Sequence, residues 1–179
     1  MMRKAGLFGL FAAAVLAAAP AVFAQENTGK ALVVYFSATG TTERAAERIA
    51  ELTGADVYEI VPAQPYTSAD LSYRNDGCRA NAEQQDPSAR PAVAGSGIAD
   101  IDAYDTVYVG FPVWWGRMPK IMFTFFEAYD FSGKTIRPFC TSGGSGIAAS
   151  VNEIRGLEPQ ADVQNGLRVR SLDDLDGWL

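Results

Sequence analysis

The sequence contains no histidine, and it has only two cysteines among 179 residues. Without histidine the chain cannot use a Ser-His-Asp or Cys-His catalytic arrangement, and it has no imidazole with which to ligate a metal ion. Two cysteines are too few for the usual zinc or iron–sulfur sites. Any redox chemistry in this protein would therefore need an organic cofactor to carry the electrons.

Internal repeats and low-complexity tracts are also absent, which argues against solenoids and disordered proteins. The length suits one domain with a single substantial core. Acidic residues outnumber basic ones, 21 to 15, so the net charge is −6. An acidic chain repels nucleic acid and favours positively charged partners or substrates, so we expect no nucleic-acid partner.

The N-terminus has the pattern of a secretory signal. Arg3 and Lys4 precede an apolar run, Leu7–Ala19, and the segment Ala21–Ala24 has small or modest residues where a signal peptidase cleaves. We predict that residues 1–24 are a cleaved signal peptide and that residues 25–179 form the mature domain. The apolar run is short for a membrane span, so we expect a periplasmic protein without stable membrane insertion; an uncleaved anchor is the alternative.

Loss of this leader would remove two basic residues and no acidic ones, which moves the net charge from −6 to −8. The mature domain would therefore be more acidic than the whole chain.

Strand-like and helix-like segments alternate along the rest of the chain. Apolar, β-branched runs predict strands at Ala31–Phe36, Asp56–Val61, Asp105–Phe111, Ile136–Thr141 and within Asp162–Val169. Helical spacing predicts a helix that ends near Gly54, then helices at Met118–Tyr129 and Ile147–Arg155, and a last one starting at Leu172.

This alternation implies a parallel, doubly wound α/β sheet with right-handed crossovers and helices on both faces. Ligands of such sheets bind at the carboxyl ends of the strands, where the winding reverses. We therefore expect a site built from the loops after the first, third and fourth strands.

The segment Pro62–Asp100 is long and polar, with room for one or two helical turns at Ala80–Gln85. Its part Tyr66–Pro91 carries several charged residues with no evident role: Arg74, Arg79, Glu83 and Arg90. The simplest interpretation is a solvated loop with internal ion pairs.

The first loop runs directly from a strand into a helix and consists of Ser37, Ala38, Thr39, Gly40, Thr41 and Thr42. Its hydroxyls and backbone N–H groups converge where the helix dipole favours an anion. It lacks both G-K-[ST] and G-x-G-x-x-G, so it is neither a P-loop nor a dinucleotide fingerprint. Neutral donors of this kind suit a phosphate monoester. A helix cap without a ligand is the alternative.

The second loop begins with Pro112, Val113, Trp114, Trp115 and Gly116. Flat aromatic side chains suit stacking on a planar ring, and a glycine lets a peptide reorient beside it. Packing of at least one of the two tryptophans in the core is the alternative.

The third loop contains Thr141, Ser142, Gly143, Gly144 and Ser145. Glycines and hydroxyls between a strand and a helix expose many N–H donors, which can bind the polar edge of a ligand or a nearby anion. A flexible connector is the alternative.

Together the loops resemble those of flavodoxins. VVYFSATGTTERAAERIA is similar to the flavodoxin phosphate loop, S/T-x-T-G-x-T, and its first helix. P-x-W-W-G-x-x-P and PFCTSGGSG resemble the corresponding loops of a bacterial flavodoxin-like subgroup, and the resemblance covers about Ala31–Gly166.

The resemblance implies a three-layer sandwich whose five-stranded parallel sheet has the order 2-1-3-4-5. It implies that the three loops bind FMN without a covalent bond, and that the flavin exchanges electrons with a redox partner protein or a small acceptor. A flavin-dependent NAD(P)H or quinone-type oxidoreductase is the alternative, and a binding module that has lost the flavin is a third reading. A signal peptide and the length of Tyr66–Pro91 are departures from typical flavodoxins.

The two cysteines are Cys78, in the long segment, and Cys140, just before the third loop. Because a signal peptide implies an oxidising compartment, a Cys78–Cys140 disulfide is a hypothesis. Two separate thiols are the alternative.

Overall fold

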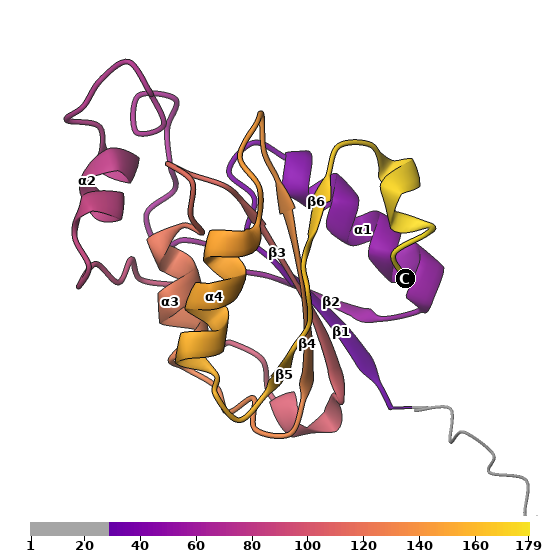
Figure 1. The fold of residues 1–179 in the computed structure, drawn as a ribbon. Helices are drawn as coiled ribbons and strands as arrows, with labels where there is room; N and C mark the ends of the chain where they lie inside the picture. Colours follow the sequence, from indigo (N-terminus) through magenta and orange to yellow (C-terminus); the bar gives the residue numbers. More distant parts are fainter. Residues whose placement is uncertain (1–28) are drawn as a thin grey trace, which may run out of the picture.

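The computed structural model describes residues 29–179, so the predicted leader, residues 1–24, lies outside the described residues. Within the described part, no helix is long and apolar enough to cross a membrane. The described residues form one sheet with helices on both faces (Figure 1).

All strand pairs of the sheet are parallel. The strands are β1 (Ala31–Tyr35), β2 (Asp56–Glu59), β3 (Thr106–Pro112), β4 (Thr135–Thr141), β5 (Asp162–Val163) and β6 (Leu167–Val169). Their order is β2-β1-β3-β4-β5, and β6 also pairs with β4. The predicted order is confirmed, and the winding reverses between β1 and β3, next to the first and second loops.

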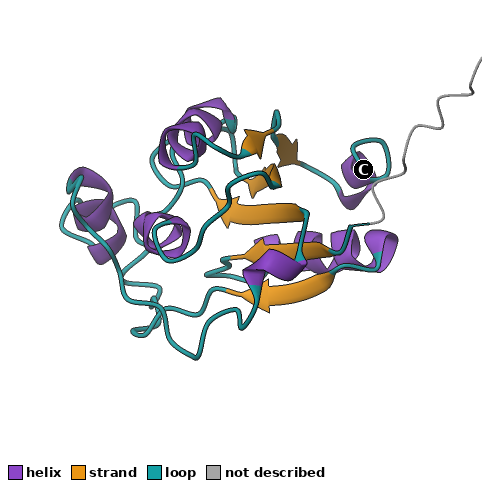
Figure 2. Ribbon diagram, turned by 90° about the horizontal axis from the view of Figure 1, so that it is seen from below, coloured by secondary structure: helices purple, strands orange, loops and turns teal. Residues whose placement is uncertain are grey.

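Helices cover both faces of the sheet, as predicted. They are α1 (Thr41–Thr53), α2 (Arg79–Gln85), α3 (Lys120–Phe126) and α4 (Ala148–Leu157), with 3₁₀ turns η1 (Ile101–Ala103) and η2 (Leu172–Leu175). Figure 1 shows α1 and η2 on one face and α3 and α4 on the other, with α2 further out on the α3 side. Figure 2, turned by 90°, shows the strands between these layers.

The two faces have separate cores because successive strand residues point to opposite sides. Leu32, Val34 and Phe36 face the larger core, under α3 and α4. Val33 and Tyr35 face the smaller core, under α1 and η2. The continuous apolar run of β1 is therefore explained by burial on both faces.

Gly110, in the middle of β3, is required by packing. A Cβ built at this position would lie 2.2 Å from a ring carbon of Phe139 on β4. Since the Phe139 ring fills the space over Gly110, any larger residue would displace it from the smaller core.

The fifth strand is split into β5 and β6, whereas we predicted one strand within Asp162–Val169. The Gln164 N–H donates to the Ile136 carbonyl, so the backbone groups of Ile136 point toward the fifth strand. Every second residue of β4 after Ile136 points its backbone groups the same way. Pro138 belongs to this set and has no N–H to donate. The ladder is therefore interrupted beside Pro138.

Two predicted helices are shorter than expected. α3 begins only at Lys120, with Pro119 at its N-cap, and ends at Phe126 instead of Tyr129. The last helix is the single turn η2, after which Trp178 packs its ring against Tyr108 and Phe139. The residues after η2 therefore pack on the sheet and do not continue the helix.

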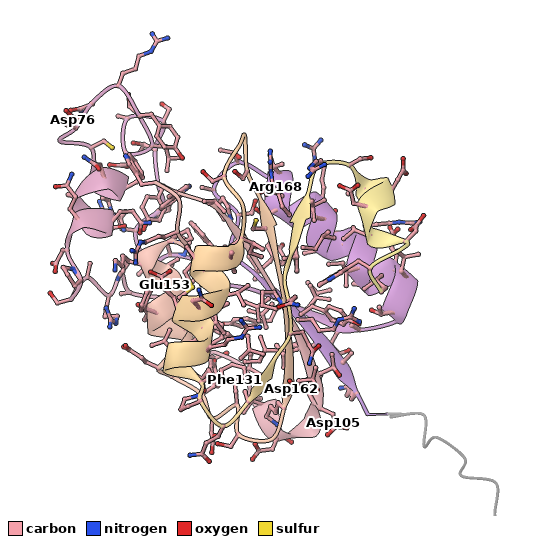
Figure 3. The ribbon with its side chains drawn as sticks, in the orientation of Figure 1. Asp76, Asp105, Phe131, Glu153, Asp162 and Arg168 are labelled. Atoms are coloured by element: carbon pink, nitrogen blue, oxygen red, sulfur yellow. The ribbon has the colours of Figure 1, made fainter. Side chains whose placement is uncertain are left out.

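The structure corrects the disulfide hypothesis, because Cys78 and Cys140 are both free and buried. Cys78 caps α2, outside the main helix layer, and Cys140 lies within β4 beside Arg168 of β6. In Figure 3, Asp76, two residues before Cys78, lies far from Arg168. Burial raises the pKa of the Cys140 thiol to about 12, so it behaves as a small core residue.

Candidate functional site

A pocket of about 690 Å³ opens at the carboxyl ends of β1, β3 and β4. All three predicted loops contribute to its wall, through Ala38, Thr39, Thr41, Pro112, Val113, Trp114, Trp115, Thr141, Ser142 and Gly143. The other candidates lie in the same loops but outside the wall: Ser37, Gly40, Thr42, Gly116, Gly144 and Ser145. The three predicted loops therefore line one pocket, at the edge of the sheet where we expected the site.

One end of the pocket is suited to an anion. Gly40 precedes α1 with φ 79°, a left-handed conformation that favours glycine, and no side chain caps the helix. Among the described residues, the first N–H groups of α1 thus have no side-chain acceptor. The Ser37 hydroxyl beside them is buried and has no hydrogen-bond partner among the described residues. A phosphate group would satisfy donors that the protein leaves unpaired.

Thr42 has a different position from the other hydroxyls of the first loop. It is buried, and its Oγ1 lies 2.7 Å from Oγ1 of Thr141. This hydrogen bond joins the first loop to the third. Thr39 and Thr41 remain as the loop's threonines on the pocket wall.

The two adjacent tryptophans occupy opposite environments. Trp114 is 6% exposed and packs edge-on against Phe36 and Tyr66, with ring centroids 5.5 and 5.0 Å away. Trp115 is 38% exposed, and its ring lies 4.6 Å from that of Tyr73, with the planes tilted by 37°. Trp114 is therefore mainly a core residue, and Trp115 is the tryptophan that can stack on a ligand.

A strained turn separates these two side chains. Trp114 and Arg117 exchange backbone hydrogen bonds of 2.9 and 3.0 Å. The residues between them, Trp115 and Gly116, both have positive φ, 47° and 81°. Positive φ at both central positions is the pattern of a type I′ turn, and it is unfavourable for a bulky residue. The turn directs one indole inward and the other outward.

Gln84 of α2 holds this turn in place. Its Nε2 donates to the carbonyls of Trp114, at 2.9 Å, and Met118, at 3.2 Å. The long segment that precedes β3 thus braces the second loop, a role that sequence analysis did not assign.

Partly buried polar contacts anchor the same segment. The Tyr66 hydroxyl donates to Glu83 at 2.5 Å, and Glu83 pairs with Arg79 at 2.7 Å. The Arg79 guanidinium also lies over the Tyr66 ring. Burial, and then the bond to Glu83, raises the pKa of Tyr66 well above its usual range. The internal ion pairs expected in this segment therefore include Arg79–Glu83, which supports the ring that packs on Trp114.

Arg90 makes the other prominent ion pair of the segment, with Glu127 at the end of α3. This ion pair connects the segment to α3 and is therefore not an internal pair of the segment.

Part of the wall was not predicted from the sequence. Leu71 and Tyr73 come from the long segment and close one side of the pocket. Their only sequence signal is a pair of apolar residues in a polar stretch, which does not show where the segment folds.

Two further wall residues, Arg168 and Arg170, come from the end of the fifth strand. The Arg168 guanidinium donates to the carbonyls of Gly144 and Ser142, while its Nε is buried and finds no partner among residues 29–179. Figure 3 shows Arg168 at the edge of the sheet opposite Asp105. Alternation in Leu-Arg-Val-Arg places both arginines on one side of the strand, and this signal was available in the sequence.

The pocket thus joins an anion-binding end to an aromatic end. Within the part of the chain that the structure describes, its wall contains two arginines and no carboxylate. Among residues 29–179, no group of three or more His, Cys, Asp or Glu side chains is arranged to hold a metal ion. The donors therefore fit a phosphorylated, planar aromatic molecule, which is what the three loops predicted.

Comparisons with known proteins agree with this description. A family model described as flavodoxin matches residues 30–179. A structure assigned as a flavoprotein from Bacteroides eggerthii is 45% identical, with a TM-score of 0.78, over 84% of this chain and 95% of the other. A structure from Bacteroides uniformis, also assigned as a flavoprotein, is 43% identical with a TM-score of 0.79. The match covers 84% of this chain and 97% of the other.

A flavoprotein from Lactobacillus acidophilus, solved in complex with FMN, has 22% identity and a TM-score of 0.65 over 84% of this chain and 98% of that one. It supports the fold alone. Comparison with curated proteins gives no match.

Proposed function

Because this chain belongs to the flavodoxin family, we propose that it binds FMN in the pocket and transfers electrons through the flavin. The observation that supports this most directly is the pocket of about 690 Å³ that connects unpaired donors at the α1 N-terminus to the exposed Trp115. Its volume lies within the usual range for small-molecule sites, about 300–1,000 Å³.

The residues divide the binding task between them. Thr39 and Thr41 line the pocket and would hold the phosphate together with the first N–H groups of α1. Ser37, which lies outside the wall, would contribute its buried, unpartnered hydroxyl. Trp115 and Tyr73 would cover the ring, and Leu71 would help exclude water from it. The bound flavin supplies the capacity to take up one or two electrons, which no side chain of this protein provides.

The charge at the pocket also bears on electron transfer. The charged residues that line the pocket are Arg168 and Arg170. Aromatic stacking on the oxidised ring lowers the reduction potential of the flavin. Positive charge stabilises the reduced, anionic flavin, so the arginines oppose this lowering.

We further propose that the protein is exported and acts as an electron carrier outside the cytoplasm. The support for export is the sequence pattern of residues 1–24. Fractionation of cells that express a C-terminally tagged chain tests it: the processed form should be released with the periplasmic proteins. A tagged chain that stays unprocessed in the cytoplasm contradicts this proposal.

FMN binding is tested by titrating the apoprotein with FMN and following flavin fluorescence. Thr39→Ala together with Thr41→Ala should weaken binding by roughly 2–4 kcal/mol, at about 1–2 kcal/mol for each charge-assisted bond lost. A matched control is Thr106→Ala with Thr135→Ala, because both threonines line a hollow at the amino ends of β3 and β4. Equal affinity in both double variants would falsify the phosphate assignment.

Turnover separates a carrier from a reductase. The holoprotein should show negligible steady-state oxidation of NADH or NADPH with quinones, while a chemical reductant reduces the flavin reversibly. Rapid turnover with a nicotinamide and a quinone would instead establish the oxidoreductase alternative.

A further inference from the structure

A second hollow, of about 260 Å³, lies directly beside the main pocket. Thr41, Thr141, Val169 and Arg170 line both hollows. Since Thr41 is the first residue of α1, the two spaces meet at the end of the main pocket that is suited to phosphate. The second hollow is therefore an extension of the site at its anionic end.

Two arginines frame this hollow from different elements. Arg44 comes from the first turn of α1, and Arg170 follows β6. Among residues 29–179, neither guanidinium forms an ion pair or a hydrogen bond. Arg48, one turn further along α1, contacts both Glu51 and Asp176. Arg44 and Arg170 thus hold unpaired positive charge in an acidic protein.

The nearby carboxylate of Asp174 does not neutralise this charge through a side-chain contact. It accepts hydrogen bonds from the backbone N–H groups of Arg170 and Ser171, at 2.8 and 3.1 Å. These two hydrogen bonds fix the backbone that carries Arg170 and do not involve its guanidinium. Thr41 and Ser171 bring further hydroxyls to the hollow.

We propose that this hollow is a second phosphate-binding site, in which Arg44 and Arg170 hold a phosphate group next to the one at the first loop. Guanidinium groups are well suited to phosphate because their fork of N–H donors matches its oxygens. The second phosphate has two sources, the outer phosphate of a flavin dinucleotide or free inorganic phosphate. The proposal rests on the proposed binding of FMN in the main pocket.

The test variant combines Arg44→Gln and Arg170→Gln in one protein, and Arg48→Gln is the matched control. FMN and FAD are titrated against each apoprotein by flavin fluorescence at fixed ionic strength, because exposed charges are screened by salt. Inorganic phosphate is titrated against each FMN-loaded protein by ³¹P NMR.

Arg44 lines the second hollow but not the main pocket, so Arg44→Gln is also tested alone. We expect Arg44→Gln to lower the affinity for FAD or for inorganic phosphate at least tenfold, while its FMN affinity falls less than threefold. The double variant should lose at least tenfold more affinity for FAD or phosphate than for FMN. Loss of FAD affinity identifies the dinucleotide as the source, and loss of phosphate affinity alone identifies the free anion. The Arg48→Gln control should change none of these affinities.

The proposal is overturned if FMN binds and neither FAD nor phosphate responds to the double substitution, and the proposed function then stands. If FMN itself fails to bind, the proposed function fails. The apoproteins are then titrated with phosphate to test the second site. If the double substitution leaves the phosphate affinity unchanged, the second site is rejected; if the affinity falls tenfold, the second site is supported.

Discussion

Trp114 and Trp115 are neighbours of the same residue type, yet the structure predicts opposite consequences when each is removed. Trp114 is 6% exposed and packs against Phe36 and Tyr66. Replacing a buried tryptophan by alanine costs about 3–5 kcal/mol, from lost burial and from the cavity that remains. Trp114→Ala should therefore remove a large share of the stability of the apoprotein, since domains of this kind have about 5–15 kcal/mol in total.

Trp115 has a φ of 47°, so the suitable replacement is glycine, which tolerates the left-handed region. Relief of this conformation returns about 1–2 kcal/mol. Loss of the contact with the Tyr73 ring costs about 0.5–1.5 kcal/mol, and the added freedom of glycine in the unfolded chain costs about 0.5–1 kcal/mol. These contributions nearly cancel. The lost burial is smaller for Trp115, which is 38% exposed, than for Trp114, so Trp115→Gly should cost clearly less stability than Trp114→Ala.

FMN affinity should show the reverse sensitivity. Stacking of one aromatic base on a protein side chain is worth about 1–3 kcal/mol, and a flavin ring on Trp115 should lose a similar amount. Trp115→Gly should thus weaken FMN binding by about 10-fold or more, at about 1.4 kcal/mol for each factor of ten.

The measurements are urea denaturation of the apoproteins, followed by far-ultraviolet circular dichroism, and FMN titration, followed by flavin fluorescence. Circular dichroism is used because the substitutions change the tryptophan signal itself. If Trp115→Gly lowers the free energy of unfolding as much as Trp114→Ala does, or leaves FMN affinity intact, the assignment of the two indoles is wrong.

Three other predictions concern the scaffold. Gln84→Leu removes both bonds to the second loop, and the urea midpoint should fall by an amount equivalent to about 1–2 kcal/mol; an unchanged midpoint would show that the brace contributes nothing. Burial, with Asp130 nearby, raises the pKa of Glu158 to about 7, so the folded state binds the extra proton and stability should fall as the pH rises from about 4.5 to about 7. Glu158→Gln should flatten that decline in thermal melts, by about 1 kcal/mol or less because the group is partly exposed to solvent; a wild-type curve flat over this range would refute the assignment. Cys78 and Cys140 should react with a thiol reagent only on unfolding, as both are buried and free; rapid labelling of either one in the native protein would contradict their burial.

The sequence by itself determined the sheet and the edge at which the site lies. Its strands are continuous apolar runs, because the central strands are buried on both faces, and such runs can be read without knowing what packs on them. Parallel order and right-handed crossovers then direct the carboxyl ends of β1, β3 and β4 to one edge. The hydroxyl-rich and glycine-rich composition of their loops marked this edge as the site.

Only the tertiary structure decided which side chain does what at that edge. Trp114 and Trp115 point in different directions because of a turn at positive φ, and each packs against a residue far away in the sequence. Local composition predicts neither the turn nor these packing partners. Tyr73 reaches the pocket because contacts near α2 fold the long segment back onto the second loop. The guanidinium of Arg168 reaches the third loop because the strand that carries it resumes pairing beyond Pro138. Each of these placements depends on contacts between residues far apart in the chain, whose burial and hydrogen bonding become defined only when the elements pack together.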